Sequence, residues 1–159
     1  MRDVLKHLDC MLVIAGEFYE AKEEYMTLIT ELELDDHTVV VDQYISNEDV
    51  SLYFCSADVV VLPYIDATQS GIIQIAFGLN KPVITTRVGG LPEVVEHGKT
   101  GLLVEKESSQ ALAQAIIQYY TDNLEEPFSK AIANTSSQFE WDVELDNIFS
   151  FITDQSDSL

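Results

Sequence analysis

The chain has 159 residues, of which 47% are hydrophobic and 23% are charged. This length and composition suit one globular domain with its own core, and no apolar run approaches the roughly 18 residues of a membrane span. With 8 Lys and Arg against 28 Asp and Glu, the formal net charge is −20. Such a surface repels nucleic acid and anionic membranes, so an anionic ligand would have to be bound locally, by backbone amides or a helix end.

The N-terminus, MRDVLKHLDC, lacks the long apolar segment of a signal peptide. The three histidines are scattered without ligand-like spacing, so we expect no metal site and no cofactor. Cys10 and Cys55 are the only cysteines, and each lies in an apolar context. We therefore predict two buried free thiols rather than a disulfide, which is typical of a reducing cytoplasm.

Short apolar runs alternate with helical patterns along the chain. An amphipathic helix is expected over 19–34, and a short helix over 46–57 with Ser46 or Asn47 as its N-cap. The segment 71–80 is apolar almost all round, which predicts a buried helix. Strands are expected at 10–16, 37–44, 58–64, 82–86 and 101–105, with further helices at 108–122 and in an amphipathic segment at 141–152.

Apolar strands separated by helices predict an α/β fold, an open, doubly wound, Rossmann-like parallel sheet of about five strands with helices on both faces. We assign residues 1–152 to this domain and 153–159 to a polar tail. Ligands of such sheets bind beyond the carboxyl ends of the strands. The loops of interest are therefore those at 16–19, 44–47, 64–71 and 87–92.

Two of these loops have unusual compositions. After the strand at 58–64 come Asp66-Ala67-Thr68-Gln69-Ser70-Gly71, several small hydrogen-bonding residues at the start of a helix. After the strand at 82–86, Gly89-Gly90 permits positive φ or close approach, and Pro92 suits the first turn of a short helix.

The string PVITTRVGGLPEVVEHGKTGLLV (82–104) resembles the C-terminal, nucleotide-sugar-binding domain of glycosyltransferase family 4, retaining enzymes with the two-domain GT-B fold. MLVIAGEFYE, VVVDQYISNEDVSLYFCSADVVVLPY and FEWDVELDNIF match other segments of that domain, so the resemblance covers nearly the whole chain. It implies a hexosyltransferase-like enzyme that uses a nucleoside-diphosphate sugar.

The resemblance implies that Thr68, Gln69, Ser70 and Gly71 hold the donor's diphosphate and sugar. A helix start offers unpaired N–H groups and a partial positive charge to an anion. A simple helix N-cap is the alternative.

The family has two glutamates eight residues apart, one of which contacts the donor sugar and the other the ribose. Their positions fall here on Ala67 and Ile75, which cannot make these contacts. Asp66 and Gln74 have the same spacing and polar side chains, and could substitute for them. Gln74 could instead be a buried glutamine bonded to backbone, and Asp66 a turn residue.

The resemblance places the nucleobase and ribose beside Tyr44, Ile45 and Ser46, with Gly16 leaving room for the nucleotide and Glu17 within reach of a hydroxyl. Half-buried packing is the alternative for Tyr44. Gly89 and Gly90 would support the donor loop.

The family's domain begins with a strand and a loop whose Arg and Lys neutralise the leaving diphosphate, and neither is recognisable here. Arg87 and Lys81 are the nearest basic candidates. The missing strand would lie between the strands at 10–16 and 58–64, and we expect that gap to close, giving one sheet in the order second, first, third, fourth, fifth. We also expect the N-terminal acceptor domain to be missing, so that the isolated chain is inactive.

Three hypotheses follow: the donor-binding part of a glycosyltransferase, a non-catalytic nucleotide-sugar-binding or interaction module, and an unrelated doubly wound domain. The third is weak, because Gly16-Glu17-Phe18-Tyr19 does not match G-x-G-x-x-G and the acids of a signalling receiver are not clustered. We expect a cytoplasmic location, with the full enzyme able to associate peripherally with a membrane.

Overall fold

Strands and helices alternate through residues 1–136, the part of the chain that the structure, a computed structural model, describes. The predicted segment 141–152 and the tail at 153–159 lie outside these residues. No described helix is long and apolar enough to cross a membrane. The elements are α1 (Arg2–Leu5), β1 (Leu12–Ala15), α2 (Lys22–Glu31), a 3-10 turn (Asp35–His37), β2 (Thr38–Val41), α3 (Asn47–Ser56), β3 (Val60–Leu62), α4 (Gly71–Gly78), β4 (Val83–Thr86), α5 (Leu91–Val94), β5 (Gly101–Val104), α6 (Ser109–Thr121) and α7 (Glu125–Ser136).

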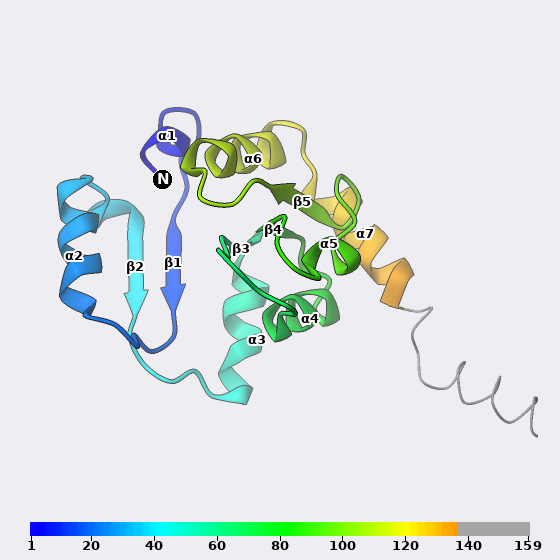
Figure 1. Cartoon of the computed structure of the whole chain (residues 1–159), viewed down its shortest axis with the longest axis horizontal. Helices are drawn as coiled ribbons and strands as arrows, with labels where there is room; N and C mark the ends of the chain where they lie inside the picture. The colour runs from blue at the N-terminus through cyan, green and yellow to red at the C-terminus, as the bar shows by residue number, and fades with distance from the viewer. Residues whose placement is uncertain (137–159) are drawn as a thin grey trace, which may run out of the picture.

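The described strands pair in parallel, as predicted, but they form two sheets. One sheet has the order β1-β2 and the other the order β3-β4-β5. Figure 1 shows β1 and β2 side by side with α2 beside β2, and the second sheet set apart from them among α4 to α7. The expectation that β1 would pair with β3 was wrong: no backbone hydrogen bonds join these two strands, so each keeps an unpaired edge.

The sheet β3-β4-β5 carries the main core, on both of its faces. Val83 and Leu103 face a cluster formed with α4 and α5, while Ile84 and Leu102 face a cluster formed with α6 and α7. Neighbouring residues of a strand point to opposite faces, so this division follows from the pleat. Continuous apolar runs such as Val83-Ile84 are what a strand covered on both faces requires.

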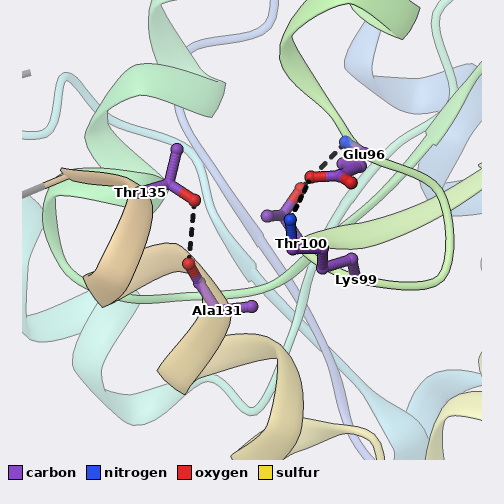
Figure 2. Close-up of polar contacts among 5 residues, drawn as sticks. All are labelled: Glu96, Lys99, Thr100, Ala131 and Thr135. Atoms are coloured by element: carbon purple, nitrogen blue, oxygen red, sulfur yellow. Dashed lines mark hydrogen bonds and ion pairs between the residues drawn. The ribbon is translucent and has the colours of Figure 1, made fainter. Parts of the chain in front are cut away.

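A tight turn brings the chain from α5 into β5. The Lys99 and Thr100 amides donate to the Glu96 carbonyl, both at 3.0 Å, and the Glu96 amide donates to Thr100 Oγ1 at 2.9 Å, as Figure 2 shows beside the Thr135–Ala131 bond of α7. Gly98, at φ 79°, occupies the left-handed region inside this turn. This turn, over EHGKTG (96–101), holds the start of β5.

The two cysteines differ from the prediction. Both are free thiols, but Cys10 is only half-buried and Cys55 is exposed on α3. An apolar neighbourhood in the sequence did not mean burial, because Cys55 lies on the outer face of an exposed helix. Partial burial raises the pKa of the Cys10 thiol, mainly by desolvation.

Candidate functional site

Two threonine hydroxyls of β4 bind the end of β3 and the start of the loop that follows it. Thr85 Oγ1 donates to the Leu62 carbonyl at 2.8 Å, and Thr86 Oγ1 donates to the Tyr64 carbonyl at 2.6 Å. Both threonines are buried, and a buried hydroxyl without a hydrogen-bond partner would destabilise the fold. These two bonds supply the partners. They extend the attachment of β3 to β4 beyond the strand itself, to the beginning of the predicted donor loop.

Gly89 and Gly90 hold the same loop from the other side. Gly89 has φ 48°, and a Cβ built there would overlap the carbonyl oxygen of Ala67. A Cβ at Gly90 would lie 2.6 Å from the Thr68 carbonyl oxygen, to which the Gly90 amide donates at 3.2 Å. Glycine is therefore needed at both positions because the 66–70 backbone packs against them.

The N-terminus of α4 is capped by Ser70, whose Oγ accepts from the Ile73 amide at 3.3 Å. The Tyr64 hydroxyl forms a 3.0 Å hydrogen bond with the same oxygen. Within the described residues, the amides of Gly71 and Ile72 have no hydrogen-bond partner, as expected for the first turn of a helix. Gly71 and Ile72 are both exposed, and a Cβ at Gly71 would meet no atom within 4 Å.

Two residues stand at the positions of the family's glutamates, Ala67 and Ile75, and two others, Asp66 and Gln74, precede them by one residue. The four differ in burial. Asp66 and Gln74 are exposed, and Gln74 lies one helical turn beyond Ser70 on the same face. Ala67 is half-buried against the core, whereas Ile75 is 40% exposed. Gln74 is therefore not a buried glutamine.

The prediction that α4 is buried was also wrong. Ile73 and Ala76 face the core, but Ile72 and Ile75 are each 40% exposed. Part of the apolar surface of α4 is therefore exposed to solvent in the described structure.

The loops after β1 and β2 form a second group. Gly16, at φ 140°, donates its amide to the Val41 carbonyl at 3.1 Å, and the Phe18 amide donates to Asp42 Oδ1 at 3.4 Å. Glu17 is exposed, as is Tyr44 at 70%, so half-buried packing of Tyr44 was wrong.

Ile45 and Ser46 are half-buried at the start of α3. Ser46 is the N-cap of that helix, accepting from the Asp49 amide at 3.2 Å.

The four loops that carry the candidate residues contact one another in two pairs. The β1 loop contacts the β2 loop, and the β3 loop contacts the β4 loop, but among residues 1–136 no hydrogen bond or ion pair joins the two groups. Two hollows lie elsewhere on the described surface and include none of the candidates; they are lined by Glu23, Glu24, Tyr25, Thr27, Leu28 and Glu31, and by Tyr119, Tyr120, Asn123, Glu125, Glu126 and Ser129.

The two basic candidates lie at opposite edges of the sheet. Lys81 precedes β4 and so lies at the amino edge, away from the donor loop. Arg87 directly follows β4, at the correct edge, with Nε 3.8 Å from Glu105 Oε1. Among the described residues no group of His, Cys, Asp or Glu is arranged to hold a metal ion.

Two residues that sequence reasoning missed belong to these loops. Tyr64 forms a hydrogen bond with Ser70, and Asp42 pairs with Lys22 at 3.0 Å. The hydrogen bond from Lys22 is the main cause that lowers the pKa of the Asp42 carboxyl. Tyr64 ends the predicted strand 58–64, and Asp42 lies near the end of the predicted strand 37–44. Their position near the carboxyl edge of the sheet was therefore the available signal.

Comparison with known proteins decides the family. The family described as "Glycosyl transferases group 1" matches residues 1–122. The chain belongs to this family. The group 1 match covers all five described strands, the predicted donor loop and the Gly89–Gly90 loop, and so includes every candidate residue described above.

Similar curated proteins are glycosyltransferases that are much longer than this chain. A D-inositol 3-phosphate glycosyltransferase of Pseudarthrobacter chlorophenolicus is 35% identical over 118 residues, 72% of this chain and 27% of that protein. The putative glycosyltransferase YtcC of Bacillus subtilis is 32% identical over 130 residues, 77% of this chain and 32% of that protein. The chain thus spans about a third or less of these two relatives.

Solved structures share the fold. HepE of Anabaena in complex with UDP superposes with a TM-score of 0.76 at 23% identity, covering 99% of this chain and 44% of HepE. The C-terminal domain of the group 1 protein LpcC from Francisella tularensis superposes with a TM-score of 0.66 at 19% identity, covering 74% of this chain and 61% of that domain. These neighbours support the α/β, GT-B-type architecture.

Proposed function

We propose that this chain is the nucleotide-sugar-binding part of a retaining glycosyltransferase, which transfers a hexose from a nucleoside-diphosphate sugar to an acceptor. The observation that carries the proposal is the exposed start of α4, where the Gly71 and Ile72 amides have no hydrogen-bond partner among the described residues and the preceding loop is held at two points, by Thr86 and by Gly90. HepE has been solved with UDP and with UDP-glucose, so a structural neighbour binds this class of ligand.

The physical argument rests on local electrostatics. The net charge of −20 disfavours a diphosphate at most of the surface. A helix N-terminus concentrates about half a positive charge on amides that need acceptors, which opposes that effect over a few ångströms. We expect Thr68 and Gln69 to contact the diphosphate beside Ser70 and Gly71, with Asp66 and Gln74 toward the sugar.

We place the base and ribose at the loops after β1 and β2, near Gly16, Glu17 and Tyr44. Exposure of Tyr44 leaves its ring free to contact a base, and the left-handed φ of Gly16 keeps the end of β1 free of a side chain. Two free cysteines suit a reducing compartment, so we retain the cytoplasm as the expected location.

A non-catalytic nucleotide-sugar-binding module is the second candidate. Ala67 and Ile75 favour it, because neither carries a polar group where the resemblance implies glutamates. Arg87 is the only basic side chain at the predicted donor loops of β3 and β4 in the described structure, and it lies beside Glu105.

Sugar transfer requires a bound donor, neutralisation of the departing diphosphate and an acceptor held at the anomeric carbon. We expect no transfer of labelled sugar by the 159-residue chain alone, and transfer once an N-terminal acceptor domain with its strand and cations is supplied, in one chain or by complementation. Transfer by the isolated chain would contradict this expectation and point to Arg87 as the neutralising group. Failure of the complete enzyme to transfer sugar would favour the non-catalytic module.

A further inference from the structure

Tyr64 is fixed at three points, although its part of the loop lies outside any regular element. Its carbonyl accepts from buried Thr86 at 2.6 Å, its amide donates to the Leu62 carbonyl at 2.9 Å, and its ring packs against the core cluster of α4 and α5. The hydroxyl end reaches Ser70 Oγ at 3.0 Å. A side chain anchored in this way holds its partner in one place.

The hydrogen-bonding capacity of the two hydroxyls limits what they can do. Ser70 Oγ already accepts from the Ile73 amide, and the bond with Tyr64 uses one of the two hydroxyl protons. If Tyr64 donates, the Ser70 proton is free; if Ser70 donates, the Tyr64 proton is free. In both cases one hydroxyl proton remains for an acceptor at the start of α4.

We propose that Tyr64 is a positioning residue for diphosphate binding: it holds Ser70 as the cap of α4 and leaves one hydroxyl proton and the Gly71 and Ile72 amides for phosphate oxygens. This inference rests on the proposed function. Without the Tyr64 hydroxyl, Ser70 can rotate about χ1, and its competing rotamers give up the cap on Ile73.

The test compares Tyr64→Phe with Tyr120→Phe in the full 159-residue chain, using UDP and uridine as probes. Tyr120 is a matched control, because its hydroxyl donates to Asp58 Oδ2 at 3.1 Å, and Asp58 lies two residues before β3, at the amino edge of the sheet. Tyr64→Phe keeps the ring in the core and removes only the hydroxyl. Isothermal calorimetry or NMR titration gives each Kd.

We expect Tyr64→Phe to raise the Kd for UDP about tenfold, the effect of one lost hydrogen bond near a charged ligand. The Kd for uridine should stay unchanged in this variant, because uridine carries no phosphate, and Tyr120→Phe should change neither Kd. Combining Tyr64→Phe with Ser70→Ala should weaken UDP binding no more than the single Ser70→Ala change, because both act through one bond.

Equal UDP affinity of wild type and Tyr64→Phe would overturn the inference and leave the proposed function standing. Equal weakening for UDP and uridine would also overturn it, since that pattern reports a general structural loss. Absence of UDP binding by the wild type, with GDP and ADP also inactive, would reject the proposed function and this inference with it.

Discussion

The two sheets are built from similar apolar strands, yet they are buried very differently. Every residue of β4 and β5 is buried. In β1 half-buried Leu12 and Ile14 alternate with exposed Val13 and Ala15, and Val39, the partner of Val13 in β2, is 44% exposed. One face of β1-β2 therefore lies open, whereas β3-β4-β5 has helices on both faces.

The difference shows that composition alone does not decide how deeply a strand is buried. MLVIAG and VVVLPY read alike, but only the second lies in a sheet with both faces covered. The packed sheet also carries the predicted donor loop, the Gly89–Gly90 loop and the start of α4. The proposed diphosphate contacts therefore lie in the more buried part of the molecule, whereas the loops proposed to hold the base lie in the less buried part.

The largest expected contrast comes from the glycines that follow β4 and β1. Gly89→Ala should cost about 3–5 kcal/mol, because it combines left-handed strain of about 1–2 kcal/mol with forced movement of the Ala67 backbone. Gly16→Ala meets no atom within 4 Å and carries only the conformational strain, about 1–2 kcal/mol. Urea unfolding of both variants measures the two losses. Equal losses would mean that the loop after β4 is not held as tightly as the structure shows.

A smaller contrast uses one substitution in both sheets. Val83→Ala removes fully buried methyl groups from β4 and should cost about 2 kcal/mol. Val13→Ala removes the same groups from a side chain that is 52% exposed and should cost about 0.5 kcal/mol or less. The same urea measurement applies. A loss at Val13 as large as that at Val83 would show that the open face of β1-β2 is covered in solution.

Much of the fold was predictable because the signals are local. Apolar runs located each strand to within a few residues, and the N-caps at Ser46 and Ser70 follow from residue type. The resemblance to a known family predicted a donor loop at 66–71, which stays a prediction, and the match over residues 1–122 confirmed membership of the glycosyltransferase family.

The rest depends on what lies beside each segment in space. The gap between β1 and β3, the exposure of Cys55 and the open face of α4 are set by neighbours that periodicity does not reveal. Tyr64 was missed because a hydroxyl bond across a turn leaves no spacing pattern. Which candidates contact a ligand stays a prediction.

The most direct test of the proposed site is a titration of the ¹⁵N-labelled chain with UDP, GDP and ADP, followed amide by amide. We expect one nucleoside diphosphate to shift Gln69, Ser70 and Gly71 first, because the first turn of α4 offers the unpaired donors. Lys81 and Gly98, which precede β4 and β5 at the amino edge of the sheet, should not move. Shifts confined to that amino edge, or no shift with any of the three nucleotides, would contradict the proposed site.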